Sequence, residues 1–378
     1  MGRLAKLWEL KVRVAARLEE ILGEAEAAEA RRDHHARRPP RPCGITIHTG
    51  VGCSMGCVYC YVPDMGFPMK PRPYHLSPLQ MAYALAVNPY VLPRATLAAY
   101  GSVTEPFLPE TRDLALRYIE EVYKWLGLPS QVSTKALLDE GLVRALARTD
   151  PRISVLVSVS SLGEWSRRLE PSAPPAEERI RAAGEAARAG LSVALFLRPI
   201  IPGVTDRQLE EIVSLAAEAG LRYVVPGMLR VTPGILRRLE AVGAPLSPIL
   251  ERLPRRPRDS RDQVPLRGSD IKARLSKIAG EYGVEVLPAA CSHNIIAHGE
   301  YCRACRLGPC GDPSRGSPVD PSDAQELLDV AGVKARVAGV KDSTLLVEGE
   351  TREVRRARIL LEAALRIPVA PLRRGRAY

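Results

Sequence analysis

Three cysteines lie close together in the segment Cys53-Ser-Met-Gly-Cys57-Val-Tyr-Cys60. A cysteine thiolate is a soft ligand that suits zinc and iron–sulfur clusters. Three thiolates can hold three of the four irons of a cubane cluster and leave the fourth iron without a protein ligand. A three-cysteine zinc site with a distant fourth ligand is the alternative, but zinc sites favour paired cysteines roughly two to four residues apart. The spacing therefore predicts a 4Fe–4S cluster on Cys53, Cys57 and Cys60.

An iron without a protein ligand can chelate a small molecule through an amine and a carboxylate. S-adenosylmethionine (SAM) carries both groups on its methionine end. One electron from the reduced cluster would cleave the sulfonium of SAM and give a 5′-deoxyadenosyl radical, while the protein holds SAM and excludes water. Gly56 lets the backbone bend closely around a cluster, and Tyr59 is placed to pack on the adenine.

A second group consists of Cys291, Cys302, Cys305 and Cys310. Four thiolates complete the ligand set of one tetrahedral ion or one cubane. An auxiliary 4Fe–4S cluster is the favoured occupant, a structural zinc ion is the alternative, and no metal is the third case. His293 and His298 lie within this segment and could replace one ligand.

The eighth cysteine, Cys43, stands alone. A lone cysteine is more often a small buried apolar residue than a reactive thiol, although Cys43 could supply a thiol at the start of a strand. Because the other cysteines form two dense groups in a long chain, a secreted disulfide scaffold is excluded.

Strands alternate with helices over the first two thirds of the chain. The expected strands are Gly44–Thr49, Thr96–Tyr100, Gln131–Ser133, Ile153–Val159, Ser192–Leu197 and Arg222–Val225. The expected helices are Pro78–Ala86, Glu110–Leu126, Leu137–Arg148, Ala176–Ala189 and Asp206–Ala219. Repeated β–α units imply a parallel sheet. They predict an α/β fold built on a partial (β/α)6 TIM-like barrel, with its chemistry at the C-terminal ends of the strands.

Composition divides the chain into four segments. Residues 1–42 hold one long N-terminal helix and a basic linker, and residues 43–240 hold the barrel. Residues 241–318 hold a Pro- and Arg-rich surface loop or lid (Gly243–Gly268), a helix, a short strand and the second cysteine group. Residues 319–378 are expected to form a small basic α+β unit.

The first cysteine motif resembles the signature of the radical SAM superfamily, because an aromatic residue precedes its last cysteine and a strand precedes the motif. Four later segments resemble, in order, the branch related to spore photoproduct lyase, also described as DNA-repair-photolyase-like. They are Gly101-Ser-Val-Thr-Glu-Pro-Phe107, Ser133-Thr-Lys135, Glu170-Pro-Ser-Ala-Pro and Arg198-Pro-Ile-Ile-Pro-Gly-Val-Thr-Asp206. The similarity covers residues 44 to 240.

The resemblance implies a SAM pocket at the ends of the second to fifth strands. Besides Tyr59, the implied contacts are Ser102, Thr104, Glu105, Lys135, Ser158, Ser160 and Arg198. The first three would hold the methionine amine, Lys135 its carboxylate, the two later serines the ribose, and Arg198 either SAM or the substrate. The same side chains also have structural uses, such as a helix cap for Ser102 and Thr104, a solvated position for Lys135 and a loop-fixing ion pair for Arg198.

The chain departs from spore photoproduct lyase at one place that matters. In that enzyme a cysteine near the end of the second strand donates a hydrogen atom late in the repair reaction. The matching stretch here is Tyr100-Gly-Ser-Val-Thr, without a cysteine. The departure argues against thymine-dimer cleavage and leaves the chemistry of the superfamily as the expectation.

Composition excludes two other classes of protein. Hydrophobic residues make up 46% of the 378 residues, which excludes a disordered chain. No apolar run approaches the ~20 residues that span a bilayer. The N-terminal segment lacks the apolar region of a secretory signal, so we expect a cytoplasmic protein without a membrane partner.

The net charge of +11 favours polyanionic or phosphorylated partners. Arginines gather in three places: Arg252, Arg255, Arg256, Arg258 and Arg261; Arg352, Arg355, Arg356 and Arg358; and Arg373, Arg374 and Arg376. The forked guanidinium suits phosphate, although such runs are equally often solvated faces. Aromatic residues that stack on bases are scarce, with three Phe and three Trp.

The sequence thus predicts a radical SAM enzyme whose substrate is unassigned, with nucleic acid modification or repair as the leading hypothesis and a ferredoxin or flavodoxin as electron donor. A radical SAM enzyme that acts on a peptide or small metabolite with an auxiliary cluster is the first alternative. A non-catalytic metal-binding protein that contacts nucleic acid is the alternative from another class.

Overall fold

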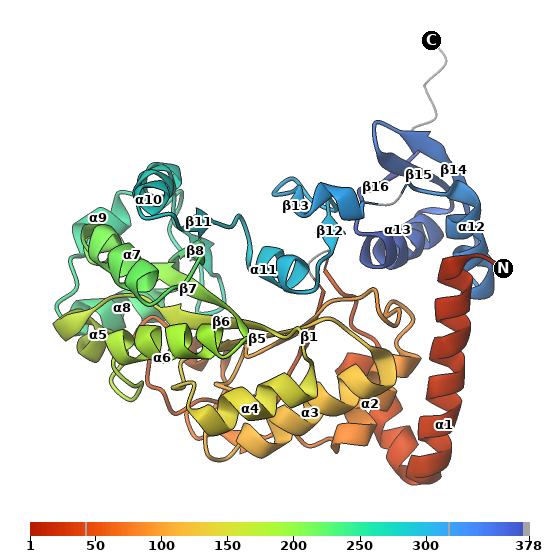
Figure 1. The fold of residues 1–378 in the computed structure, drawn as a ribbon, viewed down its shortest axis with the longest axis horizontal. Coiled ribbons are helices and arrows are strands. Elements are labelled where there is room, and N and C mark those ends of the chain that lie inside the picture. The colour runs from red at the N-terminus through yellow and green to blue at the C-terminus, as the bar shows by residue number, and fades with distance from the viewer. Residues whose placement is uncertain (42–43, 317, 373–378) are drawn as a thin grey trace.

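The computed structural model describes residues 1–41, 44–316 and 318–372, so Cys43 and the terminal arginines Arg373, Arg374 and Arg376 lie outside the described residues. A parallel sheet of seven strands forms the centre of the molecule (Figure 1). In spatial order the strands are β1 (Ile45–Ile47), β4 (Ala98–Tyr100), β5 (Ser130–Thr134), β6 (Ser154–Val159), β7 (Ser192–Ile200), β8 (Tyr223–Met228) and β11 (Glu285–Val286). Spatial order follows chain order, as in a barrel left open along one side, which confirms the expected fold class.

The last strand extends the expected six units by one. Strand β11 pairs with β8 in parallel, with Glu285 opposite Tyr223 and Val286 opposite Val224. The helix that precedes it, α10 (Ser269–Glu281), packs on α7 (Leu209–Glu218) and so supplies a further crossover. The sequence predicted a short strand in this segment. It did not predict that the strand joins the sheet, because a strand of two residues carries too little pattern to indicate its neighbour.

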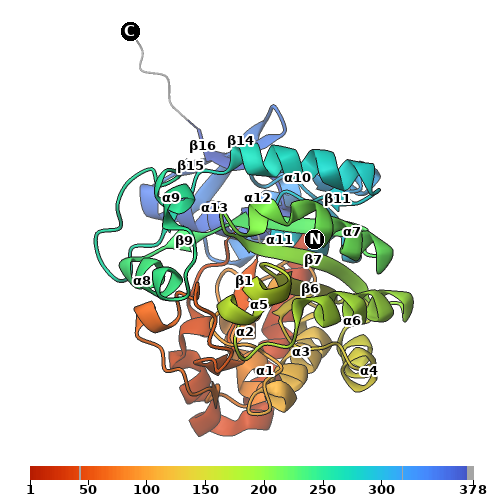
Figure 2. The same ribbon diagram turned by 90° about the vertical axis from the view of Figure 1, so that its left-hand side faces the viewer.

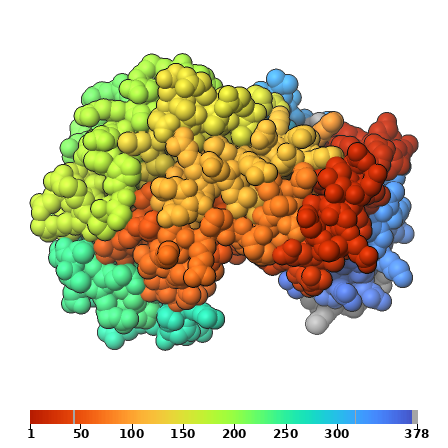
Figure 3. Space-filling model, turned by 90° about the horizontal axis from the view of Figure 1, so that it is seen from below, coloured from red at the N-terminus to blue at the C-terminus, as the bar shows by residue number. Residues whose placement is uncertain are grey.

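Helices pack on the outer face of the sheet and share one apolar core with it. Besides α7 and α10 they are α2 (Pro78–Val87), α3 (Arg112–Leu126), α4 (Glu140–Thr149) and α6 (Ala176–Arg188). Helix α4 shows how the sequence specifies them: Asp139 accepts a hydrogen bond from the Leu142 amide at 2.7 Å and caps the helix, and Leu142, Val143 and Leu146 are buried. Seen from below, the surface runs without a break from red to yellow, the colours of the N-terminal segments that contain α1 to α4 (Figure 3).

The N-terminal helix is not one straight rod, contrary to the prediction. Helix α1 (Arg3–Arg32) is broken at Gly23, whose φ of 74° and ψ of 172° are not helical. Arg31 Nη1 lies 2.6 Å from Glu19 Oε1, whereas twelve residues of straight helix would separate the two by about 18 Å. Gly23 therefore turns the chain back, and the second arm packs beside α2. A 3-10 helix, η1 (His34–Ala36), follows.

The predicted loop or lid between Gly243 and Gly268 contains a short helix and a short strand. It contains α9 (Leu246–Leu250) and β10 (Val264–Pro265), which pairs with β9 (Arg230–Val231). Helices α5 (Gly163–Leu169), α8 (Pro233–Ala241) and α9 lie at the C-terminal ends of the strands, where they share a second apolar cluster with Val58 and Tyr59 (Figure 2).

The C-terminal part contains α12 (Pro321–Val330), β14 (Ala335–Lys341), β15 (Thr344–Gly349), α13 (Thr351–Leu365) and β16 (Val369–Pro371). Its core also takes in Leu4, Leu92 and Ala95, so the first arm of α1 connects this unit to the barrel. Among the described residues, no helix has the length and apolar character needed to cross a membrane.

Candidate active site

The first cysteine loop lies at the C-terminal end of the sheet and is held by backbone hydrogen bonds. The Val58 amide donates to the Leu169 carbonyl at 2.9 Å, and the Ser172 amide donates to the Met55 carbonyl at 3.3 Å. Gly56 has a φ of 66°, and a Cβ there would lie 3.3 Å from Pro171 Cγ. The close turn expected at Gly56 is therefore present, and it packs the loop against the segment after α5.

Burial is the largest influence on the three thiols. It raises the pKa of Cys53 and Cys60 and raises the pKa of Cys57 to about 12. The charges of Cys53 and Cys60 also act on Cys57, which places the three side chains together. The Val62 amide points at Cys60 Sγ from 3.4 Å. Because metal ions bind thiolates, iron binding here would release protons.

The spacing of the sulfur atoms distinguishes two kinds of metal site. Within the described ranges, neither cysteine group brings three sulfur atoms within 4.8 Å of one another. With Zn–S bonds of about 2.3 Å, a tetrahedral zinc ion needs sulfurs about 3.8 Å apart. A cubane spaces them more widely, because each thiolate binds a different iron. As they stand, no three sulfur atoms of either described group are close enough to share one zinc ion.

Arg238 on α8 fastens the cysteine loop from outside, a contact that the sequence gave no reason to expect. Its Nη2 donates to the Cys60 carbonyl at 2.7 Å and its Nε to the Val58 carbonyl at 3.0 Å. Its Nη1 lies 2.8 Å from Oδ1 of Asp64, which Thr232 also contacts. One guanidinium thus fixes two carbonyls of the first cysteine loop.

Replacing Arg238 by alanine is expected to loosen the first cluster. The change removes two hydrogen bonds from a charged donor and leaves the Asp64 carboxylate without its cation, a loss of about 2 kcal/mol. The rate of iron loss to a chelator from the anaerobically reconstituted chain measures the effect. The exposed neighbour Arg237 provides the matched control, and equal rates for Arg238→Ala and Arg237→Ala would contradict the assignment.

A buried polar network lies beneath the loop and centres on Glu170. The Tyr59 hydroxyl and the Ser160 hydroxyl, the latter at 3.0 Å, both donate to Glu170 Oε1. Arg179 forms a fully buried ion pair with Glu170 Oε2 and donates to the Ser158 carbonyl. Burial would raise the pKa of Glu170, but Arg179 and Lys135 more than offset it and lower the pKa. The hydroxyls of Tyr59 and Ser160, both predicted SAM contacts, are thus engaged with protein.

The carboxylate of Glu105 is also engaged with protein. Its Oε2 accepts the Lys135 amide at 2.8 Å, and its Oε1 accepts the Phe107 amide at 3.2 Å and the Thr134 hydroxyl. The Thr104 hydroxyl donates to the Gly52 carbonyl. Two predicted contacts of the SAM amine therefore connect the end of β4 to the end of β5 and to the cysteine loop.

The ammonium group of Lys135 lies 5.6 Å from the centre of the Tyr59 ring, a cation–π distance. Burial would lower its pKa, but the charges of Cys57, Glu170 and Glu105 outweigh burial and raise it. Lys135 is therefore a firmly charged cation between the cluster ligands and the two engaged carboxylates.

The remaining predicted SAM contacts lie around the rim. Ser102 is exposed, and its carbonyl accepts the Tyr61 hydroxyl at 2.6 Å, whereas Ser158 is buried. Arg198 packs its stem on Gly227, where a Cβ would lie 2.7 Å from Arg198 Cδ. Burial and then the charge of Arg230 lower the pKa of Arg198.

The second cysteine group lies at the opposite end of the sheet. Cys291 is on α11 (Ala290–Ala297), and Cys302 and Cys310 face each other on β12 (Tyr301–Cys302) and β13 (Cys310–Gly311). All four cysteines line one small cavity, together with Ala289, Ile295, Ala304, Leu307 and Gly308. Helix α11 is anchored at the starts of the strands, where Gln131 Nε2 donates to the Ala290 carbonyl at 2.7 Å.

Neither histidine of this region faces the cysteine cavity as a ligand. His293 contacts Ser154 Oγ at 2.8 Å through Nδ1 and Ser192 Oγ at 3.3 Å through Nε2. His298 contacts the Asn294 carbonyl at 2.9 Å and Asp150 Oδ2 at 3.0 Å. Since both rings use both nitrogens elsewhere, the suggestion that either replaces a cysteine is wrong.

Comparison with known proteins agrees with this arrangement. Residues 47–216 match the family model described as the radical SAM superfamily. The fold is similar to that of a mutant of spore photoproduct lyase with bound AdoMet and dinucleoside spore photoproduct, with a TM-score of 0.54 and 18% identity over 70% of this chain and 85% of that chain. A second mutant of that enzyme gives a TM-score of 0.53 with the same identity and coverage.

No curated protein matches the chain by sequence. The family match covers the first cysteine group and the first strands of the sheet, and the structural match covers 70% of the chain. Residues 47–216 are a radical SAM domain in a fold like that of spore photoproduct lyase, and the chain is an enzyme of the radical SAM class.

Proposed function

We propose that this enzyme binds a 4Fe–4S cluster on Cys53, Cys57 and Cys60, cleaves SAM reductively and acts on a phosphate-bearing substrate, with nucleic acid as the leading candidate. When bound, the cluster and SAM would supply a 5′-deoxyadenosyl radical. One observation carries the proposal: three half-buried thiols lie together in one loop, and the carboxylates beside them are already engaged.

The engaged carboxylates favour an open iron. Glu105 and Glu170 are the carboxylates whose charges act on Cys53 and Cys57. All their oxygens accept hydrogen bonds or an ion pair from protein groups. Neither carboxylate is free to bind the iron that the three cysteines leave without a ligand. That iron would therefore be open to the amine and carboxylate of SAM.

Lys135 is the side chain best suited to the SAM carboxylate. Its charge is retained, and it lies beside the Cys57 thiol. Thr104, Glu105, Ser160 and Tyr59 would shape the pocket by holding the loops, and Ser102, Ser158 and Arg198 remain predicted contacts of SAM or substrate.

Arg198 and Arg230 support an anionic substrate. They lie near each other at the ends of β7 and β9, beside Tyr61, and neither forms an ion pair within the ranges that the structure describes. Two exposed like charges without a carboxylate partner in those ranges favour an anion between them. By contrast, Arg255 and Arg258 of the loop pair with Asp262, and Arg356 and Arg358 pair with Glu353 and Glu362.

For the second cysteine group we propose an auxiliary 4Fe–4S cluster. All four thiols line one apolar cavity, and no three of them all lie within 4.8 Å of one another, which supports a cubane over zinc. Because α11 lies at the N-terminal ends of the strands, this cluster would be separated from SAM by the length of the barrel. It is thus suited to electron entry or to fixing α11 rather than to holding the substrate beside SAM.

Replacing Cys302 by alanine is expected to lower the iron content of the anaerobically reconstituted chain from about eight to about four per chain. The change removes a ligand of the auxiliary cluster and leaves the first cluster intact. Iron analysis of the chain, with the exposed neighbour Arg306→Ala as control, measures this. About four irons in the unmodified chain and in Cys302→Ala alike would overturn the auxiliary cluster without affecting the first.

Release of 5′-deoxyadenosine from SAM tests the proposed function. The reconstituted chain, reduced by dithionite or by a cytoplasmic ferredoxin or flavodoxin, should release it, and oligonucleotides should accelerate the release more than peptides do. Arg198→Ala with Arg230→Ala should abolish that acceleration. Nucleic acid binding with no affinity for SAM would instead support a non-catalytic protein, and acceleration by peptides alone would support the peptide alternative.

A further inference from the structure

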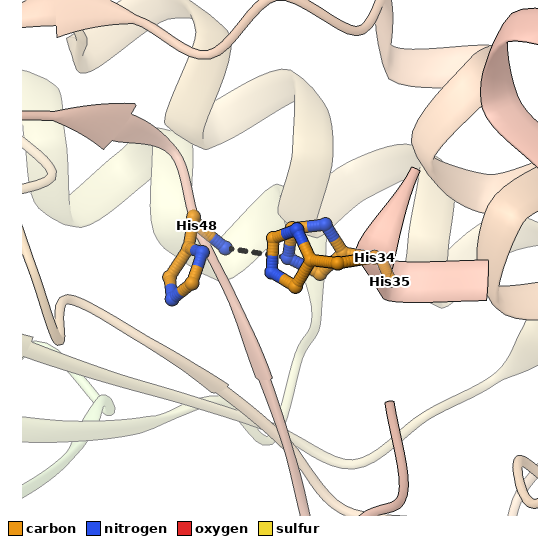
Figure 4. Close-up of side chains that lie close together, drawn as sticks. All are labelled: His34, His35 and His48. Carbon is orange, nitrogen blue, oxygen red and sulfur yellow. Dashed lines mark hydrogen bonds between the residues drawn. The ribbon is translucent and has the colours of Figure 1, made fainter. Parts of the chain in front are cut away.

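A group of histidines outside the cysteine sites has the features of a metal site. The chain has six histidines, and four of them, His34, His35, His48 and His75, gather around the buried carboxylate of Asp33. His34 and His35 come from η1, after α1, and His48 directly follows β1 (Figure 4). The group therefore joins two segments that the sequence separates by a proline-rich linker.

Three of these rings converge closely enough to share one ion. One ring nitrogen from each of His34, His35 and His48 lies within 4.8 Å of those from the other two. The ring centres are 4.0 to 5.2 Å apart. In the described part of the chain no other set of three His, Cys, Asp or Glu side chains does this. A tetrahedral zinc ion with Zn–N bonds of about 2.0–2.1 Å needs nitrogens about 3.4 Å apart, so small side-chain rotations would close the site.

The hydrogen-bond network orients two of the rings for metal binding. Asp33 accepts the His35 Nδ1–H at 2.7 Å and the Tyr74 hydroxyl at 2.7 Å. With its proton directed at Asp33, Tyr74 can only accept from His34 Nδ1, 3.1 Å away. The network thus assigns the free lone pair of both rings to Nε2. A carboxylate behind a histidine is the usual outer contact of a metal-bound imidazole.

The lone pair of His35 has one weak occupant, the His48 amide, whose nitrogen lies 3.2 Å from Nε2 (Figure 4). A metal–imidazole bond is much stronger than a hydrogen bond of this length. An ion would therefore displace this contact. His34 has about half of its side chain exposed, which gives the ion a way in and leaves a position open to solvent.

The charges around the group fit a cation. Burial and the neighbouring rings lower the pKa of His34 to about 4 and of His48 to about 3, and burial also lowers the pKa of His35. Burial would raise the pKa of Asp33, but hydrogen bonds from His35 and Tyr74 hold it well below its usual range. Arg38 is the opposing positive charge, and His75 reaches Asp33 Oδ2 at 3.4 Å. The Asp33 carboxylate balances the charge of Arg38, and the three uncharged imidazoles present lone pairs to an ion without repelling it.

We propose that His34, His35 and His48 bind one divalent transition-metal ion of the zinc type, with the Asp33 carboxylate as its outer contact. The ion would fasten the end of α1 and η1 to the end of β1, where the chain enters the first cysteine loop. The proposal is independent of the proposed reaction, because none of these residues belongs to the cysteine groups or to the predicted SAM pocket.

Zinc binding to the full chain, with its clusters first reconstituted so that the thiolates are occupied, tests the proposal. After treatment with a chelator and addition of one equivalent of Zn²⁺, desalted protein should retain about one zinc. X-ray absorption at the zinc edge should show imidazole nitrogen and no sulfur at about 2.3 Å. No retained zinc, or a sulfur shell, would overturn the proposal.

Variants identify the ligands. His34→Ala is expected to weaken zinc binding at least tenfold in competition with a chelating dye, and His34 is exposed enough that its loss should leave the fold intact. His75→Ala is the matched control, because His75 contacts Asp33 but lies outside the three converging rings, and it should retain zinc. His34→Ala decides the test: a zinc affinity equal to that of the unmodified chain would contradict the assignment. This holds even if His48→Ala fails to fold.

Discussion

Replacing Cys57 by alanine is expected to lower the iron content of the reconstituted chain from about eight to about four and to reduce release of 5′-deoxyadenosine from SAM to background. Two thiolates remain at that site. Because the site is buried, an iron that has lost its cysteine ligand, or a charged thiolate without a partner, is unfavourable there. The second cysteine group, at the other end of the sheet, should keep its cluster. Iron analysis and chromatography of the reaction products measure both effects.

Two controls make this result interpretable. Ser54→Ala changes a neighbouring residue of the same loop and should keep both clusters and the reaction. Cys302→Ala should lose the auxiliary irons and still bind SAM. If Cys57→Ala released 5′-deoxyadenosine like the unmodified chain, the first cysteine group would not be the site of SAM cleavage.

Arg179→Ala is expected to cause the largest loss of stability, about 3–5 kcal/mol, because it leaves the carboxylate of Glu170 buried without a cation. Both side chains of this pair are fully buried. Arg179 also donates to the Ser158 carbonyl and, at 2.9 Å, to the Pro174 carbonyl. Thermal unfolding of the metal-free chain, followed by circular dichroism, measures the loss.

Arg181→Ala on the same helix is the control, since Arg181 is exposed and should change stability by less than about 0.5 kcal/mol. Glu170→Gln should also destabilise the chain, because it keeps the hydrogen bonds from Tyr59 and Ser160 but leaves the buried Arg179 cation without its anion. Equal stability of Arg179→Ala and Arg181→Ala would show that the buried pair does not support the cysteine loop.

The sequence predicted the barrel because its periodic patterns are local. A buried apolar strand such as Ile153–Val159, or a capped amphipathic helix such as α4, can be recognised from a short stretch of sequence. The break at Gly23 was missed, because an isolated glycine in a helical pattern is usually tolerated. The place of β11 in the sheet was missed because register and neighbours are set by packing between distant segments.

The sequence predicted candidate ligands but not the residues that hold their loop. Cysteine spacing is a local signal, so Cys53, Cys57 and Cys60 are predicted as cluster ligands from the sequence alone, and that assignment stays a prediction. Arg238 and Arg179 each sit in an ordinary amphipathic helix, and nothing near them in the sequence marks their contacts with Cys60 and Glu170. The histidine group was likewise missed, because His34 and His35 beside arginines gave no hint that His48 would fold against them.

Electron paramagnetic resonance of the reduced chain, with and without SAM, tests the central claim most directly. In Cys302→Ala, which should contain the first cluster alone, the signal of the reduced 4Fe–4S cluster should change on addition of SAM, because SAM binds the iron that lacks a protein ligand. The account predicts this change and its loss in Cys57→Ala. A reduced cluster in Cys302→Ala whose signal is the same with and without SAM would contradict the claim that an open iron receives SAM.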